Sequence, residues 1–142
     1  MDEHDADRPQ TSVMVAVGIN PHSQRLLDAA ARLAHGLDAT LLAVHVHQPS
    51  AQASLYRSNV DWQFEQARAR GAQTDMIEGQ DVAATLVEHA QRRGVTHLVI
   101  GQSDVSRWHE IRHGSIINHV LREIARQHVA LDLYIVTSTS GV

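Results

Sequence analysis

The stretch GQSDVSRWHEIRHGS combines residues that could surround a phosphate group. It begins at Gly101, directly after the apolar run THLVI, and ends with Gly114 and Ser115, directly before the pattern IINHVLREIARQ. A glycine at a strand end and a Gly-Ser pair at a helix start leave backbone N–H groups open to an anion. Arg107 adds a planar guanidinium that can bind phosphate in a bidentate manner. The alternative interpretation is a turn glycine followed by an ordinary serine N-cap.

Metal binding and catalysis find less support in the residue types. The sequence contains 11 histidines, and His45 and His47 would project from one face of a strand. There is no cysteine and no HExxH motif, so no metal site is predicted. Ser115 has no base and acid at a recognisable spacing, and the lysine-free chain cannot form a Walker motif. We therefore expect no enzyme, with slow nucleotide hydrolysis as the remaining catalytic alternative.

Composition indicates one globular domain. The 142 residues are 43% hydrophobic and 20% charged, which is ordinary for a packed domain. The net charge of −4 at pH 7 creates no overall field that would attract nucleic acid or an anionic membrane. No apolar run is long enough to span a bilayer, and the acidic start MDEHDADRPQ is unlike a signal peptide. We expect a cytoplasmic protein without membrane insertion or nucleic-acid binding.

Five apolar runs alternate with four helical patterns. Strands are expected at residues 11–18, 40–47, 73–77, 96–101 and 130–137, and helices near 20–36, 55–71, 82–93 and from 115 onward. This alternation predicts an α/β fold, a three-layer open five-stranded parallel sheet with helices on both faces. The domain is expected to span residues 11–138, between a disordered acidic tail at 1–10 and a loose C-terminus at 139–142.

Local signals refine the helices. Gly36 is expected to stop the first helix, and Trp62 is expected on the apolar side of the second. Asp81 is expected to cap the third. In an open parallel sheet, ligands bind beyond the carboxyl ends of the strands where the strand order reverses. The loops after the first, second and fourth strands are therefore expected to meet at one site.

Four segments together resemble a known family. They are GQDVAATLVEHAQRRGVTHLVIG, SRWHEIRHGSIINHVLR, LDLYIVT and, more weakly, VAVGINPHSQRLLDAAARLAHGLDATLLAVHV. Over residues 11–137 the chain resembles the universal stress proteins, and especially the universal stress protein domain of KdpD potassium-sensor histidine kinases. The resemblance implies a Rossmann-like sheet of the adenine nucleotide alpha hydrolase type. It also implies a homodimer through the last strand, with Ala130, Asp132, Tyr134 and Val136 at the contact.

The resemblance further implies a nucleotide site. Nucleotide-binding members of the family carry Gly-x2-Gly-x9-Gly-Ser after the fourth strand, which corresponds here to Gly101, Asp104, Gly114 and Ser115. The spacing is kept, whereas the second glycine is replaced. Those members also carry a ribose-holding aspartate after the first strand, and that position here is Gly18.

Related KdpD domains bind cyclic di-AMP through serines after the first strand and a Phe-Thr-Ala-x-Tyr stretch in the second. The serine positions are Gly18 and Asn20 in this chain. Of the second stretch only Ala43 is kept, and His45 stands in place of the tyrosine. Gln102 stands where lysine is usual.

The preferred hypothesis is a stand-alone KdpD-type universal stress protein that acts as a regulatory or sensory module in stress, potassium or osmotic signalling. It would bind an adenine nucleotide (ATP, AMP or cyclic di-AMP). The expected nucleotide- or anion-binding residues are Gly18, Asn20, Ser23, Ala43, His45, Gly101, Arg107, Gly114 and Ser115. Two alternatives remain: a ligand-free dimeric protein-interaction domain with a degenerate site, and an excised universal stress protein domain of a KdpD-like sensor kinase.

Overall fold

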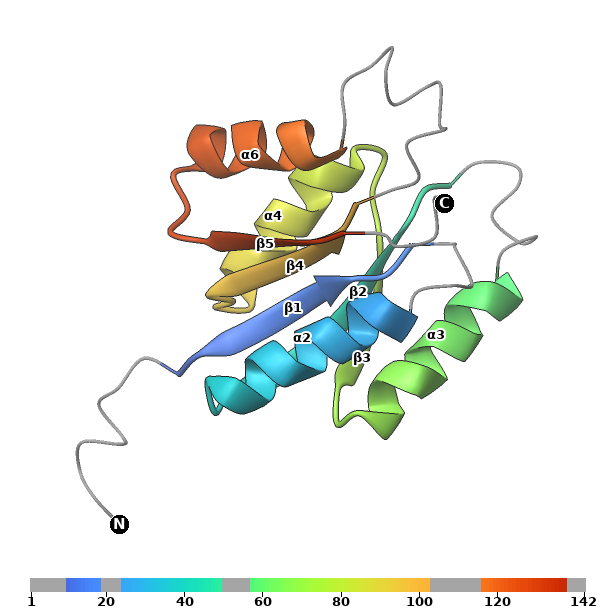
Figure 1. Cartoon of the computed structure of the whole chain (residues 1–142). Coiled ribbons are helices and arrows are strands. Elements are labelled where there is room, and N and C mark those ends of the chain that lie inside the picture. The colour runs from blue at the N-terminus through green and yellow to red at the C-terminus, as the bar shows by residue number, and fades with distance from the viewer. Residues whose placement is uncertain (1–9, 19–23, 50–56, 103–115, 138–142) are drawn as a thin grey trace.

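The computed structural model describes residues 10–18, 24–49, 57–102 and 116–137. Within them every predicted strand and helix forms (Figure 1). The elements in chain order are β1 (Ser12–Ala16), α2 (Gln24–Gly36), β2 (Thr40–His47), α3 (Arg57–Ala69), β3 (Gln73–Glu78), α4 (Val82–Arg92), β4 (His97–Gly101), α6 (Ile116–Gln127) and β5 (Asp132–Val136). The predicted alternation of strands and helices is therefore confirmed.

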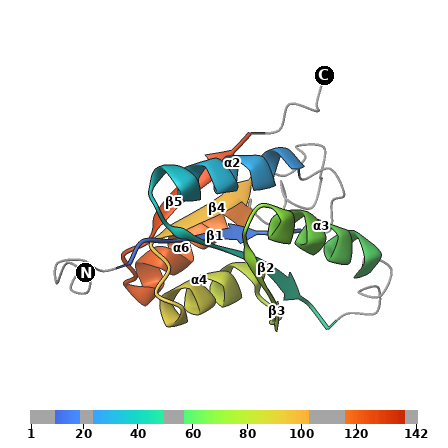
Figure 2. The same ribbon diagram turned by 90° about the horizontal axis from the view of Figure 1, so that it is seen from below.

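The strands form one parallel sheet in the order β3-β2-β1-β4-β5. The chain moves outward from β1 to β3 through α2 and α3, which cover one face, and returns through α4 and α6, which cover the other (Figure 2). This arrangement confirms the three-layer α/β fold class. The direction of travel reverses between β1 and β4, so the helices that follow these two neighbouring strands, α2 and α6, lie on opposite faces of the sheet.

Alternation along the strands divides the core into two layers. On β1, Val13 and Val15 pack toward α2 and α3, while Met14 packs toward α4 and α6. On β2, Leu41 and Ala43 belong to the first layer and Leu42, Val44 and Val46 to the second. Both faces of the two strands are apolar because both are covered by helices, which explains their near-continuous hydrophobic sequences.

α2 ends at Gly36 as predicted, although Gly36 is not the left-handed residue that reverses the chain. α2 includes Gly36, and the left-handed residue that ends it is Asp38, with φ of 54°. Asp38 N–H bonds to the His35 carbonyl, and the next N–H, of Ala39, bonds back to Ala34 at 2.8 Å. Gly71 serves the same purpose after α3 with φ of 87°. The chain therefore reverses through a Schellman-type pair of hydrogen bonds. The left-handed conformation that this motif requires is also open to aspartate, at some cost in free energy.

The apolar face of α3 differs from the prediction in a way that matters for the site. Trp62 is 36% exposed, whereas Gln63 is completely buried between Val60, Phe64 and Ala67 on the helix face that packs on the sheet. Successive residues turn by about 100° around a helix, so residue 62 lies well away from the face that carries residues 60, 64 and 67. Helical spacing decides which side chain is buried here, and residue hydrophobicity does not.

The N-cap of α4 agrees with the prediction. Asp81 Oδ1 accepts a hydrogen bond from the Ala84 N–H at 3.1 Å. This bond satisfies one of the backbone donors that a helix start leaves without an internal partner.

Candidate functional site

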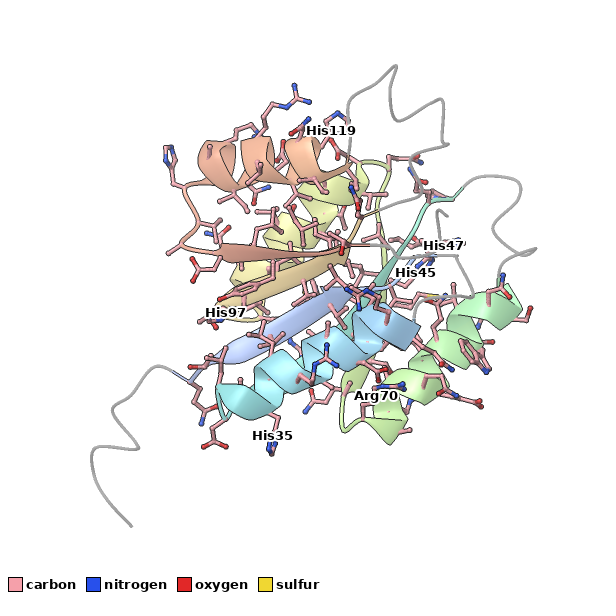
Figure 3. The ribbon with its side chains drawn as sticks, viewed as in Figure 1. His35, His45, His47, Arg70, His97 and His119 are labelled. Atoms are coloured by element: carbon pink, nitrogen blue, oxygen red, sulfur yellow. The ribbon has the colours of Figure 1, made fainter. Side chains whose placement is uncertain are left out.

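Three of the predicted site residues that the structure describes lie at one edge of the sheet, where the strands end. Gly18 follows β1, His45 lies near the end of β2, and Gly101 is the last residue of β4. Because the strands are parallel and β1 lies between β2 and β4, these positions share one edge of the sheet. Figure 3 shows His45 and His47 at this edge, close to the end of β1.

His45 connects β2 to the end of β1. Its side chain lies on the same strand face as Leu41 and Ala43, and only 9% of the residue is exposed. The ring nitrogen Nδ1 lies 2.7 Å from the Val17 carbonyl oxygen, and the Val17 N–H donates to the Val44 carbonyl. Both backbone groups of Val17 are thus held by β2, which fixes the point where the chain leaves the sheet.

Burial lowers the pKa of His45 below its ordinary value of 6.5, and nearby His47 lowers it further, whereas the hydrogen bond to Val17 raises it. The unfolded chain therefore binds this proton more readily than the folded one. Stability from the neutral imidazole is present above about pH 6.5 and is lost as pH falls through the lower folded pKa. We predict that urea unfolding from about pH 7.5 to pH 5 shows a shallower acid loss for His45→Asn than for the wild type. Parallel losses in the two proteins would contradict this prediction.

Gln63 holds the next carbonyl. From the buried face of α3, its side-chain amide donates to the Gly18 carbonyl at 2.9 Å and to the Asn59 carbonyl at 3.2 Å. Consecutive carbonyl groups after β1 are therefore bound by side chains from two different elements. Sequence reasoning missed Gln63, although a glutamine at a position with core spacing in an amphipathic helix was a usable signal.

The first turn of α2 contacts the end of β4 at the same edge. A Cβ placed on Gly101 would lie 3.5 Å from Leu26 Cδ2, in ordinary van der Waals contact. The neighbouring Arg25 donates from Nε to the Thr137 carbonyl just after β5, at 2.8 Å. The guanidinium of Arg25 is therefore fixed at this edge, and it was also not among the predicted site residues.

The two glycines of the site have no evident structural necessity. A Cβ on Gly18 would meet nothing within 4 Å, and the left-handed glycines of the described chain are Gly71 and Gly94. Neither Gly18 nor Gly101 is thus required by backbone conformation or by packing against described residues. Gly18 is exposed, so glycine at this position leaves the backbone beside the reversal point accessible to close approach.

The remaining predicted residues are placed as follows. Ala43 is completely buried in the core layer under α2, so its contact with a ligand stays a prediction. Asn20, Ser23, Arg107, Gly114 and Ser115 lie outside the described residues.

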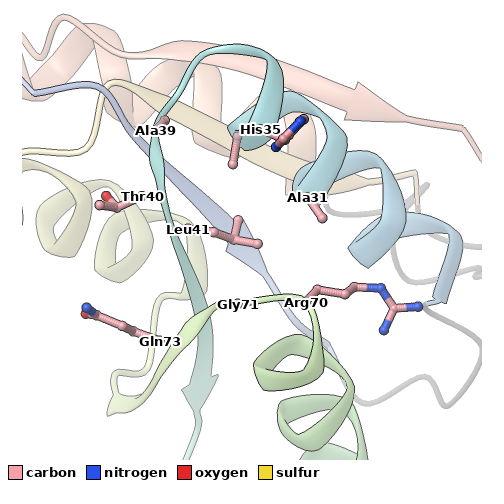
Figure 4. A pocket seen from close by; sticks show the side chains of 9 residues that line it. Ala31, His35, Ala39, Thr40, Leu41, Arg70, Gly71 and Gln73 are labelled. Carbon is pink, nitrogen blue, oxygen red and sulfur yellow. The ribbon is translucent and has the colours of Figure 1, made fainter.

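A surface cavity of about 260 Å³ lies at the opposite edge of the sheet (Figure 4). It is lined by Ala31, Ala34, His35, Ala39, Thr40, Leu41, Arg70, Gly71 and Gln73. Arg70 is already bonded to Asp28 at 2.7 Å and to the Gln66 carbonyl at 2.9 Å. The cavity is therefore separate from the predicted site, and its guanidinium is engaged within the protein.

The described residues also bear on metal binding and membrane insertion. They hold no group of three or more histidine, cysteine or acidic side chains arranged for a metal ion. None of the helices they form combines the length and apolar character that a membrane span requires.

The family model of the universal stress protein family matches residues 11–126. The sensor protein KdpD of Mycobacterium tuberculosis is 34% identical over 96 residues, which is 68% of this chain and 11% of that protein. KdpD of Clostridium acetobutylicum is 20% identical over 132 residues, covering 90% of this chain and 14% of its own length. This chain therefore spans a small part of the curated relatives it matches.

Solved structures share the fold. A universal stress protein in complex with cAMP has a TM-score of 0.67 and 24% identity, covering 93% of this chain and all of that one. The universal stress protein from Archaeoglobus fulgidus in complex with dAMP has a TM-score of 0.61 and 17% identity, covering 92% and 98%. This chain thus shares its overall fold with both structures.

Proposed function

Because this chain belongs to the universal stress protein family, we propose that it is a regulatory domain that binds an adenine nucleotide beyond the ends of β1 and β4. The observation that carries the proposal is the open backbone at Gly18, which is exposed and lies beside the reversal point. Neither backbone strain nor packing against described residues explains Gly18, and a ligand that approaches the backbone closely would account for it. Relatives of the same fold are solved with cAMP and with dAMP, which supports adenine as the base.

The charges at this edge suit a phosphate. α2 directs the positive end of its dipole toward the carboxyl ends of the strands, where Arg25 adds a full charge. Among the described residues, Arg25 bonds Thr137 through Nε, and its terminal nitrogens Nη1 and Nη2 have no hydrogen-bond partner there. Those two nitrogens can form the bidentate contact that phosphate oxygens favour.

Titration calorimetry and thermal unfolding with ATP, AMP, cAMP and cyclic di-AMP test this proposal. We expect binding of at least one nucleotide, weakened roughly threefold to tenfold in Arg25→Ala by loss of an exposed charged hydrogen bond. Arg32→Ala is the matched control, because it removes the same exposed charge two turns further along α2. No binding of any nucleotide at millimolar concentration, or equal weakening in both variants, would count against the proposed site.

The role in signalling follows from the KdpD similarity. We propose that nucleotide binding changes the contacts of this domain with a partner protein in stress, potassium or osmotic regulation. The similarity covers 96 residues, which is 11% of the mycobacterial sensor. The proposed regulatory role therefore rests on membership of the universal stress protein family. The same similarity is compatible with a stand-alone protein and with a domain excised from a longer sensor.

We also propose that the chain forms a homodimer through β5, because this strand is exposed at an edge of the sheet. This strand is an edge of the sheet, and Tyr134 and Ile135 are 43% and 46% exposed. His97 on β4 contacts two residues of β5. The ring centroids of His97 and Tyr134 are 5.6 Å apart, and His97 Nε2 lies 3.7 Å from Asp132 Oδ2. Antiparallel pairing of β5 with the same strand of a second copy would give the backbone N–H and C=O groups of this edge hydrogen-bond partners. It would also cover the side chains of Tyr134 and Ile135.

We predict that Tyr134→Asp converts the dimer to monomer. Pairing around a two-fold axis near residue 134 would bring two introduced carboxylates together, and juxtaposed like charges weaken association by roughly a hundredfold. Sedimentation equilibrium measures this dissociation constant. Met76→Asp is the control, since Met76 is 41% exposed on β3 at the other edge of the sheet. A monomeric wild type, or equal loss of dimer in both variants, would exclude β5 as the interface.

A further inference from the structure

The hydrogen bond of His45 determines which of its ring nitrogens carries the proton. The Val17 carbonyl oxygen can only accept, so Nδ1, at 2.7 Å, must be the donor. A neutral imidazole has one ring proton, which leaves Nε2 with a lone pair. The fold therefore fixes one tautomer, and the second nitrogen of the ring becomes a hydrogen-bond acceptor.

Nε2 is also not completely enclosed, although only 9% of His45 is exposed. In the described part of the chain, every fully buried side-chain nitrogen or oxygen has a hydrogen-bond partner. The bond described for His45 is made by Nδ1, so Nε2 keeps some contact with accessible space. His45 lies at the carboxyl edge of the sheet (Figure 3). Its side chain is on the face that α2 and α3 cover, where Gln63 also lies.

The character of this acceptor decides what it can bind. A neutral nitrogen lone pair repels phosphate and carbonyl oxygens and accepts from an amino or hydroxyl group. Burial lowers the pKa of His45, which favours the neutral ring near neutral pH. In an adenine nucleotide the strong donor on the base is the 6-amino group.

Resting on the proposed nucleotide binding, we infer that His45 Nε2 accepts a hydrogen bond from the 6-amino group of adenine and thereby selects 6-amino purines. Val17 sets the tautomer, and Gln63 holds the adjoining Gly18 carbonyl, so the acceptor is positioned before the ligand arrives. A site that offers a fixed acceptor discriminates against analogues without the matching donor.

Two substitutions separate recognition from support of the fold. His45→Asn places an amide nitrogen where Nδ1 was, which keeps a donor for Val17 and removes the acceptor at Nε2. His45→Gln places an amide oxygen near the position of Nε2 and removes the donor to Val17. The first variant is expected to lose selectivity, and the second is expected to lose thermal stability while keeping selectivity.

The experiment compares AMP with purine riboside 5′-monophosphate, which carries hydrogen in place of the 6-amino group. Titration calorimetry of the wild type should give roughly threefold to tenfold tighter binding of AMP. His45→Asn should bind the two nucleotides within about twofold of each other, and His45→Gln should keep the preference.

Equal binding of the two nucleotides by the wild type, or an unchanged preference in His45→Asn, would overturn the inference and leave the proposed function intact. If neither nucleotide binds the wild type, the proposed function fails and the inference fails with it.

Discussion

Gly18→Asp should raise the affinity of this chain for AMP roughly tenfold, because it restores the carboxylate that the family resemblance places against the ribose. The substitution is structurally permitted. Gly18 is exposed, a Cβ there meets nothing within 4 Å, and the residue is not among the left-handed glycines. Hydrogen bonds from ribose hydroxyls to a charged acceptor contribute about 1.5–3 kcal/mol, part of which is offset by ordering the side chain. Titration calorimetry measures the change.

Two controls isolate the ribose contact. Gly18→Ala adds the Cβ without the carboxylate and should leave the affinity unchanged. The 2′,3′-dideoxy analogue of AMP lacks the hydroxyl groups and should show no gain with Gly18→Asp. An equal gain for the dideoxy analogue, or no gain in a variant with native circular dichroism, would show that position 18 does not face the ribose.

Gln63→Glu should lower the free energy of unfolding by about 3–5 kcal/mol at neutral pH. The amide that it replaces is completely buried and donates to the carbonyls of Gly18 and Asn59. An ionised carboxylate has no proton to donate, so it would face two carbonyl oxygens in a buried position. Since Gly18 starts the loop that leads to α2, nucleotide binding should weaken together with stability.

The pH dependence of this variant has a definite sign. Burial raises the pKa of the introduced carboxyl above its unfolded value of about 4.3, so the folded state binds the proton more tightly. Stability relative to the wild type should therefore fall as pH rises from about 4.3 through the raised pKa. Urea unfolding at about pH 5 and pH 7.5 measures it, with Gln63→Leu as a control that loses about 1–3 kcal/mol at both values. A loss in Gln63→Glu no greater than in Gln63→Leu at the higher pH would contradict the buried donor role.

The sequence by itself determined the fold class and which strand ends share an edge of the sheet. Near-continuous apolar runs at β1 and β2 indicated strands covered on both faces, and the alternation with helical patterns left a parallel sheet as the simple solution. Parallel strands put the ends of β1, β2 and β4 at one edge, so Gly18, His45 and Gly101 were expected together. The period of apolar residues along the sequence indicates each strand and helix, and the order of strands and helices indicates the parallel sheet.

The partners of those residues depended on the tertiary structure. His45 could be taken from its type as a ligand or a pH-sensitive group, but its Nδ1 bond to Val17 joins residues 28 positions apart. Gln63 reaches Gly18 across 45 positions, and Arg25 reaches Thr137 across 112. No local pattern records such contacts.

The physical reason is that burial of an element repeats along the sequence, whereas the hydrogen-bond partner of a side chain does not. Burial of an apolar face repeats with the period of its own helix or strand, so the sequence carries it. The state of a polar group depends on which distant atom lies within about 3 Å of it, and only the packing of strands and helices decides that. The sequence thus predicted the edge at which we propose a nucleotide site. The tertiary structure decided that His45 Nδ1 bonds to Val17, that Gln63 donates to the Gly18 carbonyl, and that Arg25 lies at the same edge.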